Sequence, residues 1–137
     1  MKEKQFKSHC PVNFAQETFG DRWSLLIIRD LMFKCKQYYG DFLNSDEKIS
    51  TNILAARLEK LEAVGLITKA IDQENHSKKL YSLTQKGIDL MPMLLEMIAW
   101  SAKYDEQTEA PAEFIASFEK DRAALIEQLK DNLTQQN

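Results

Sequence analysis

The sequence contains few of the residues that build the commonest catalytic and metal sites. It has four glycines, three prolines, two cysteines and two histidines in 137 residues. Four glycines provide no Gly-rich loop for a phosphate. The two histidines, His9 and His76, lie far apart in polar stretches, which argues against a metal cluster or a Cys–His nucleophile. We therefore expect no enzyme activity, no bound metal and no cofactor.

The sequence also lacks long hydrophobic runs. No apolar segment approaches the roughly 18 residues that a membrane span requires. The first nine residues, MKEKQFKSH, are charged and have no apolar centre like that of a signal peptide. Cys10 and Cys35 are too few for a disulfide framework and form no CxxC motif. These absences predict a cytoplasmic protein with no membrane partner.

The charges are distributed unevenly along a chain whose net charge is −3. Residues 48–86 carry seven Lys or Arg and four Asp or Glu, a balance of +3, whereas residues 105–137 carry three and eight, a balance of −5. The middle of the chain can face phosphate, and the tail would be repelled by it. Charge alone leaves ordinary surface scatter as an equally good interpretation.

Hydrophobic periodicity and capping residues predict a mainly α chain with a small β-hairpin. The predicted elements are helices at residues 11–19, 22–33, 37–44 and 50–64, strands at 66–71 and 79–84, and helices at 85–104 and 112–133. Pro11 follows the cap position Cys10, and Asp21 caps the second helix. Pro92 should kink the helix at 85–104.

The helix at 50–64 has an unusual outer face. Its apolar arc of roughly 140° comprises Ile53, Leu54, Leu58, Leu61 and Val64, which predicts one buried side. The opposite side and the first turn carry small residues where a surface helix usually has long charged ones, namely Ser50, Thr51, Asn52, Ala55 and Ala56. Such a face suits the close approach of something large. The plainer alternative is that Ser50 is only a cap and the alanines are only helix formers.

The order of three helices, a turn, a helix and a hairpin is that of a winged helix-turn-helix, in which the recognition helix enters the major groove. Specific motifs agree with this order: CPV at 10–12, GDRWSLLIIRDL at 20–31, YGDF at 39–42, ISTNILAARLEKLEAVGLI at 49–67, YSLTQKG at 81–87 and Trp100. On these motifs, residues 9–104 resemble the HxlR family of bacterial transcription regulators, relatives of the MarR group. Two stretches depart from the family pattern. CKQYYGDFL at 35–43 lacks a proline and the usual basic residues, and DQENHSKK at 72–79 has two acids and no proline.

The resemblance implies a winged helix-turn-helix domain over residues 1–104. The final helix lies outside this resemblance, and its amphipathic pattern predicts that residues 105–137 form a linker and a C-terminal helix that takes part in a dimer interface. The expected function is that of a DNA-binding transcriptional regulator, with repression favoured. Two copies would place their recognition helices about one turn of duplex, ~34 Å, apart on a pseudo-palindromic operator.

The chemistry of base edges and phosphates assigns roles to individual residues. Asn52 can pair with adenine, and Thr51, Ala55 and Ala56 suit thymine methyl groups. Ser50 and Thr51 can hold a phosphate at the start of the helix. The other predicted DNA-binding residues are Lys60, His76, Lys78 and Lys79. Arg57 remains open between a structural ion pair, with Glu62 or Asp30, and a phosphate contact.

Cys10 is a candidate redox sensor because a thiol at the start of a helix has a lowered pKa. Some members of the resembling family sense electrophiles or oxidants through a cysteine at this position, and Cys35 is a candidate resolving partner. The alternative is that both thiols are chemically idle. A small-molecule effector in a pocket between the winged domain and the long helices is a further possibility.

A different class of function also fits the pattern. A winged helix can bind protein instead of DNA, with the small-residue face of the helix at 50–64 receiving a partner helix. Loss of DNA binding in an Asn52→Ala, Lys60→Ala variant that keeps its dimer would favour DNA.

Overall fold

The computed structural model describes residues 5–136. The described residues form two compact units, divided between Thr84 and Gln85. The sequence places the end of the winged domain at residue 104. In the structure the helices of 85–104 belong to the second unit, and the domain limit at residue 104 stays a prediction.

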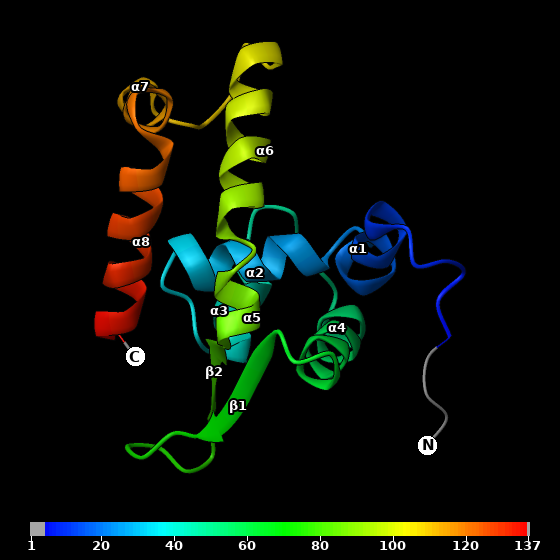
Figure 1. The fold of residues 1–137 in the computed structure, drawn as a ribbon. Coiled ribbons are helices and arrows are strands. Elements are labelled where there is room, and N and C mark those ends of the chain that lie inside the picture. Colours follow the sequence, from blue (N-terminus) through cyan, green and yellow to red (C-terminus); the bar gives the residue numbers. More distant parts are fainter. Residues whose placement is uncertain (1–4, 137) are drawn as a thin grey trace. The chain divides into compact units, whose positions relative to one another are not determined.

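From residue 5 on, the first unit contains four helices and a hairpin, in the order that the sequence predicts (Figure 1). The elements are α1 (Pro11–Phe19), α2 (Ser24–Phe33), α3 (Tyr39–Leu43), α4 (Thr51–Ala63), β1 (Ile67–Ile71) and β2 (Lys79–Leu83). The two strands pair antiparallel, with Lys69 opposite Tyr81. This arrangement confirms the mainly α fold with a β-hairpin wing.

The core of this unit is built from the apolar sides of its helices and the first residues of the wing. Its most buried side chains, each at most 1% exposed, are Ile28, Phe42, Leu54, Leu61, Leu66 and Ile67. Burying each such side chain contributes roughly 1.5–3 kcal/mol. Ile53 was predicted to lie in the buried arc of the helix at 50–64, but its side chain is 36% exposed. The buried stripe of α4 is therefore narrower than predicted.

Local capping determines where the helices begin. The Ser50 hydroxyl oxygen accepts a hydrogen bond from the Ile53 N–H at 3.3 Å, which caps α4 as predicted. The Asp21 carboxylate accepts bonds from the N–H groups of Trp23 and Ser24 at 2.9 and 3.0 Å. It therefore satisfies N–H groups at the start of α2, but the regular helix starts at Ser24 and its N-cap position is Trp23 rather than the predicted Asp21.

The second unit contains α5 (Gln85–Ile88), α6 (Met91–Tyr104), α7 (Ala112–Lys120) and α8 (Arg122–Gln136). The prediction of one kinked helix over 85–104 is wrong. Pro92 lies in the first turn of α6, where its missing N–H has no intrahelical partner to lose, so the chain forms two helices. The prediction of one helix over 112–133 is also wrong. Asp121 is extended, with φ −156° and ψ 92°, and its carboxylate accepts a bond from the Ala124 N–H at 3.1 Å, starting α8.

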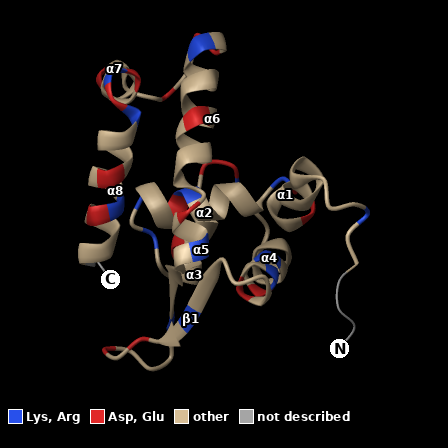
Figure 2. Ribbon diagram, in the orientation of Figure 1, with Lys and Arg blue, Asp and Glu red and all other residues tan. Residues whose placement is uncertain are grey.

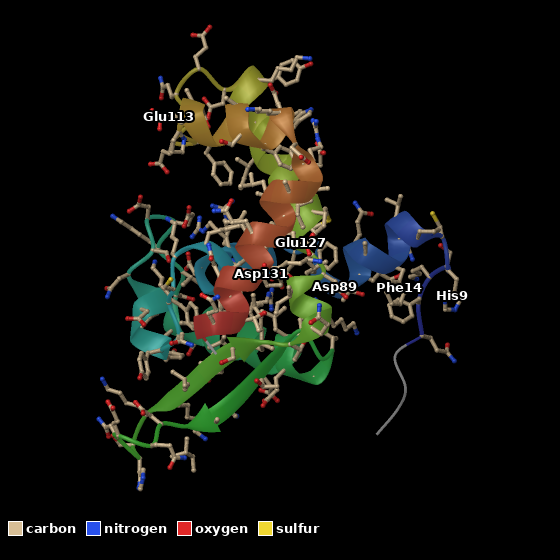
Figure 3. The ribbon with its side chains drawn as sticks, turned by 60° about the vertical axis from the view of Figure 1, so that its left-hand side comes forward. His9, Phe14, Asp89, Glu113, Glu127 and Asp131 are labelled. Carbon is tan, nitrogen blue, oxygen red and sulfur yellow. The ribbon has the colours of Figure 1, made fainter. Side chains whose placement is uncertain are left out.

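Ion pairs join the helices of the second unit. Arg122 Nε lies 2.8 Å from Glu96 Oε1, joining α8 to α6. Lys130 Nζ lies 3.9 Å from Asp89 Oδ1. Figure 3 labels Asp89 and, on α8 next to Lys130 in the sequence, Glu127 and Asp131. Figure 2 shows the acidic residues distributed over α7 and α8. Within the described residues, no helix combines the length and apolar character needed to cross a membrane.

Candidate nucleic-acid interface

Helix α4 has one side in the core and one side in solvent. Leu54, Leu58 and Leu61 are at most 3% exposed. The predicted contact residues on the other side, Thr51, Asn52, Ala55 and Ala56, are all exposed. The helix is therefore anchored by leucines, and the exposed residues of its first one and a half turns are mostly short, while Glu59 is exposed further along the helix.

The first turn of α4 is fixed from two directions. The Ser50 hydroxyl oxygen caps the helix, which leaves the Ser50 O–H proton able to donate to another group. The Tyr39 hydroxyl donates to the Thr51 carbonyl oxygen at 2.9 Å, tying α3 to the same turn. Neither bond removes Thr51 or Asn52 from solvent, so this end of the helix stays accessible and held in place.

Arg57 and Lys60 both face Asp21, 36 and 39 positions earlier in the chain. Arg57 Nε lies 2.9 Å from Asp21 Oδ1, and Lys60 Nζ lies 3.5 Å from Asp21 Oδ2. Arg57 thus has the structural ion pair that the sequence allowed, but neither Glu62 nor Asp30 is its partner. Lys60, predicted to bind phosphate, is close to a carboxylate.

Asp21 is held in its charged form. Partial burial by itself would raise the pKa of the Asp21 carboxyl. Hydrogen bonds from Ser24, from the Trp23 N–H and from Arg57 outweigh burial and hold this pKa far below its usual range. The Asp21 carboxylate is therefore charged near neutral pH, as its ion pair with Arg57 requires.

The wing residues singled out by the sequence, His76, Lys78 and Lys79, are all exposed. The turn is shaped by Asn75, whose side-chain oxygen accepts bonds from the Ser77 N–H and hydroxyl at 3.1 and 2.6 Å. The structure thus brings the two lysines to the same strand end, with His76 two residues before Lys78 in the turn.

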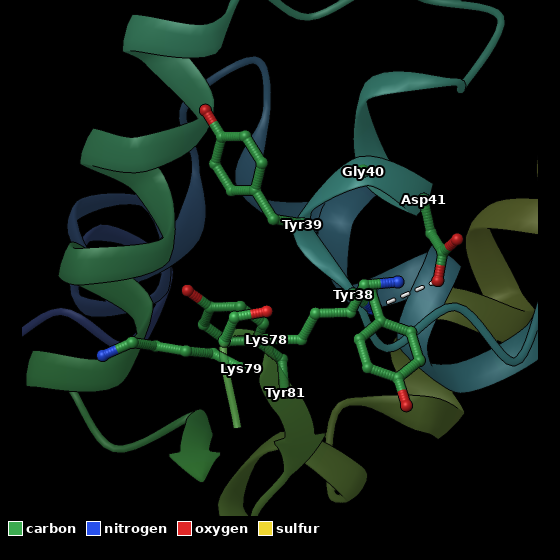
Figure 4. A pocket seen from close by; sticks show the side chains of 8 residues that line it. Tyr38, Tyr39, Gly40, Asp41, Lys78, Lys79 and Tyr81 are labelled. Atoms are coloured by element: carbon green, nitrogen blue, oxygen red, sulfur yellow. Dashed lines mark hydrogen bonds between the residues drawn. The ribbon is translucent and has the colours of Figure 1, made fainter. Parts of the chain in front are cut away.

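A hollow of about 430 Å³ lies between α3 and the wing (Figure 4). Its lining comes from two segments of chain, Tyr38–Asp41 and Ser77–Lys79 with Tyr81. Tyr38, Tyr39 and Tyr81 were not among the predicted site residues. The one available indication was the double tyrosine in CKQYYGDFL, where the family pattern differs.

Both cysteines are exposed thiols. Cys10 is the N-cap of α1 but makes no side-chain capping hydrogen bond of regular geometry. Even so, the backbone N–H groups of Asn13 and Val12 lower the pKa of the Cys10 thiol, as predicted for this position. Cys35 follows α2 with a left-handed φ of 53°, an uncommon conformation for a residue other than glycine.

Comparisons with known proteins agree with this geometry. The family model for the HxlR-like helix-turn-helix matches residues 18–109. The HTH-type transcriptional regulator YodB of Bacillus subtilis is 32% identical over 105 residues, 76% of this chain and 93% of YodB. YodB has been solved in a reduced form and with a bound quinone.

Two further solved structures have the same fold. PA1607 superimposes with a TM-score of 0.67 at 33% identity, covering 77% of this chain and 72% of PA1607. The redox regulator HypR in its oxidised form superimposes with a TM-score of 0.61 at 28% identity, covering 69% of this chain and 96% of HypR. The family match spans well over half of the chain and includes α4 and the wing, so the chain belongs to the HxlR family of helix-turn-helix transcription regulators.

Proposed function

We propose that this regulator binds duplex DNA through α4, with Asn52 contacting adenine and Thr51, Ala55 and Ala56 contacting thymine methyl groups. The observation that carries this proposal is the exposure of every small residue on the outer face of α4 while its leucines anchor the helix. Short side chains let the helix backbone approach base edges in the major groove. Ser50 and the wing residues His76, Lys78 and Lys79 contact the flanking phosphates.

Lys60 contacts a further phosphate in the complex, whereas in the free protein its ammonium group lies 3.5 Å from Asp21 Oδ2. That separation is long for a hydrogen bond, and the lysine side chain is 33% exposed. A DNA phosphate can therefore draw Lys60 away while Arg57 keeps its shorter bond to Asp21.

The protein acts as a homodimer on a pseudo-palindromic operator. Support comes from an exposed apolar stripe on α6, where Met97, Trp100 and Tyr104 are 45%, 67% and 65% exposed. Spacings of three and four residues place them on one face of the helix. A second exposed apolar pair, Val12 and Phe14, lies on α1. An apolar stripe like that of α6 is typical of association sites.

Oxidants or electrophiles acting on Cys10 regulate DNA binding. The thiol is exposed and its pKa is lowered, so it has more thiolate, the reactive form, than an ordinary cysteine. The relatives HypR and YodB support this proposal: HypR is a redox regulator, and YodB binds a quinone. Cys35 is the candidate resolving thiol, from the same or the partner chain.

Selection of DNA from a random library by the purified full chain tests the proposed function. We expect a pseudo-palindromic consensus whose affinity falls steeply between 50 and 200 mM salt, because cations on α4 and the wing neutralise phosphates. Recovery of no consensus, with random DNA bound equally well or not at all, would favour a protein partner for the face of α4 instead. Repeating the selection with oxidant tests the role of Cys10.

A further inference from the structure

In the described part of the chain, the wing loop, residues 72–78, makes one hydrogen bond to a segment outside the hairpin. The Tyr38 hydroxyl donates to Asp72 Oδ2 at 2.8 Å, from 34 positions earlier in the chain. The other bonds of the loop are local: the Asp72 N–H donates to the Lys78 carbonyl oxygen at 3.0 Å, and Asn75 shapes the turn. Tyr38 therefore joins the loop to the start of α3.

The backbone on the Tyr38 side of this bond is itself held in place. The Tyr38 N–H donates to the Asp41 carboxylate at 3.1 Å, and the Tyr38 carbonyl oxygen accepts from the Asp41 N–H at 3.0 Å. The neighbouring Gln37 carbonyl oxygen accepts from the Tyr81 N–H at 2.8 Å, which joins this segment to β2. The Tyr38 residue is half-buried. Its hydroxyl is thus a fixed point of attachment for the loop.

The Asp72 carboxylate uses one oxygen within the turn and the other for Tyr38. Oδ1 accepts from the Glu74 N–H at 3.0 Å, and Oδ2 accepts from the Tyr38 hydroxyl. The Glu74 N–H and then the Tyr38 hydroxyl lower the pKa of the Asp72 carboxyl, so the group is charged near neutral pH. A negative charge on the wing opposes phosphate, and the bond to Tyr38 gives this charge a different use.

Tyr38 also lies against one of the wing lysines. Lys78 Nζ is 5.4 Å from the centre of the Tyr38 ring, within the range of a cation–π contact. Figure 4 shows Lys78 reaching over Tyr38, whereas Lys79 extends to the opposite side of the hollow. Tyr38 thus contacts the loop where it begins, at Asp72, and where it ends, at Lys78.

We propose that Tyr38 is a positioning residue for DNA binding, which holds the wing loop in place before Lys78 and Lys79 meet the duplex. The proposal rests on the proposed DNA binding and adds to it the residue on which the placement of the wing depends. A loop that must first be ordered costs binding free energy, and a loop ordered beforehand avoids that cost. Tyr38 acts through the loop and contacts no DNA itself.

Loss of the Tyr38 hydroxyl should weaken DNA binding differently from loss of a cation. Tyr38→Phe keeps the ring and every phosphate contact. Affinity should therefore fall roughly 2- to 10-fold at each salt concentration, while the slope of log affinity against log salt stays unchanged. Removal of one phosphate contact would instead lower the magnitude of that slope by about 0.9 per protomer.

The first experiment compares Tyr38→Phe with the matched control Tyr81→Phe. Tyr81 lines the same hollow, and its hydroxyl makes no hydrogen bond within residues 5–136. The natural chain and both variants are titrated with the selected operator at four salt concentrations, and thermal unfolding checks that all three fold. We expect weaker binding with an unchanged slope in Tyr38→Phe only. Equal affinities of the two variants, or a slope lowered by about 0.9 in Tyr38→Phe, would overturn the positioning role.

A double-mutant cycle tests whether Tyr38 acts through the wing lysines. The variant Lys78→Gln, Lys79→Gln has no wing ammonium group left to position. Adding Tyr38→Phe to it should therefore cause little further loss of affinity, although Tyr38→Phe alone weakens the natural chain. The same fold-loss in both backgrounds would overturn the proposal.

Two substitutions of Asp72 test the other end of the bond. Asp72→Asn keeps an acceptor oxygen for the Tyr38 hydroxyl, Asp72→Ala removes it, and both remove the same charge. Asp72→Ala should therefore bind the operator more weakly than Asp72→Asn, and the difference should narrow in the Tyr38→Phe background. Equal affinities of the two Asp72 variants would count against the hydroxyl–carboxylate bond as the means of positioning.

Trypsin measures the placement of the loop without DNA, because it cleaves after lysine. The bond after Lys78 should be cut several-fold faster in Tyr38→Phe than in the natural chain or Tyr81→Phe, since a released loop opens more often. Mass spectrometry follows this cleavage, and equal rates in all three chains would overturn the proposal.

Failure of the positioning role is distinguishable from failure of the proposed function. A natural chain that binds no DNA would refute DNA binding and, with it, the role of Tyr38. Tight operator binding by the natural chain that Tyr38→Phe leaves unaltered would refute the role of Tyr38 alone.

Discussion

Arg57 Nε lies 2.9 Å from Asp21 Oδ1 and thereby joins the outer helix α4 to the turn that precedes α2. The same carboxylate caps α2 through the N–H groups of Trp23 and Ser24. One side chain thus starts one helix and holds another in position.

Replacing Asp21 with alanine should lower the free energy of unfolding by about 2 kcal/mol, because the change removes a helix cap and an ionic hydrogen bond together. Urea unfolding of the full chain measures the loss. Asp46→Ala, at an exposed position of the turn before α4, serves as the control and should change stability by less than about 0.5 kcal/mol. Equal effects of the two substitutions would contradict a connecting role for Asp21.

Acid should lower the free energy of unfolding by protonating Glu47. Hydrogen bonds from Arg29, at 2.8 and 3.0 Å, lower the pKa of the Glu47 carboxyl to about 2. The folded pKa lies below the unfolded value of ~4.3, so the stabilisation is present above that value and is lost as the pH falls toward 2. It amounts to on the order of 2 kcal/mol after allowance for solvent screening.

The check for Glu47 is urea unfolding at pH 6, 4 and 2.5 of the natural chain and of Glu47→Gln. The natural chain should be more stable at pH 6, and the gap should narrow as the pH falls. Glu113→Gln, at an exposed carboxylate of α7, should show no such narrowing. A constant gap for Glu47→Gln would mean that its ion pair with Arg29 does not stabilise the fold.

The elements predicted correctly from the sequence are those set by neighbouring residues. The cap at Ser50, the leucines of α4 and the two strands depend on residues within one or two turns or along one strand. The interruptions of the helices after Ile88 and at Asp121 were not predicted. Helical periodicity continues across both, while the first-turn preference of Pro92 and the extended backbone of Asp121 decide the outcome.

At the candidate DNA interface, features of a single helix were predictable, and contacts between distant residues were not. The exposure of Thr51 and Asn52 was predictable because it follows from the helical periodicity of residues 50–64 alone. The Arg57 partner did not, because Asp21 lies 36 residues away and several acids were equally plausible. The hollow was also out of reach, since Tyr38 and Lys78 meet only when the wing folds beside α3. Long-range pairings of this kind require the fold before they can be assigned.

Replacing Asn52 with alanine should reduce discrimination at a single base pair by roughly 1–3 kcal/mol, because a bidentate contact to adenine is lost. Anisotropy titrations with operators changed at one pair at a time measure this. Asn132→Ala, at an exposed position of α8, is the matched control and should bind all operators like the natural chain. A uniform loss across operators would indicate a backbone contact for Asn52.

An acidic residue on the apolar stripe of α6 should weaken self-association. Trp100→Glu places a charge on a face that also carries Met97 and Tyr104, so a dimer that buries this face would have to bury the charge. Sedimentation velocity at several concentrations should show a shift toward monomer. Ile71→Glu makes the same kind of change at an exposed wing position and should leave the mass unchanged. Identical profiles for both variants would exclude this face of α6 from the interface.

The Cys10 thiol should react with iodoacetamide at lower pH than the same thiol in the unfolded chain. In the fold, the N–H groups of Asn13 and Val12 stabilise its thiolate, and unfolding removes them. The variant Cys35→Ser isolates Cys10, and its labelling rate is followed by mass spectrometry from pH 5 to 9, with and without denaturing urea. The folded profile should have its midpoint below the ~8.5 of a free cysteine, and the unfolded profile should return to that value. Coincident profiles would show that the helix start leaves this thiol unactivated, and oxidant sensing through Cys10 would lose its chemical basis.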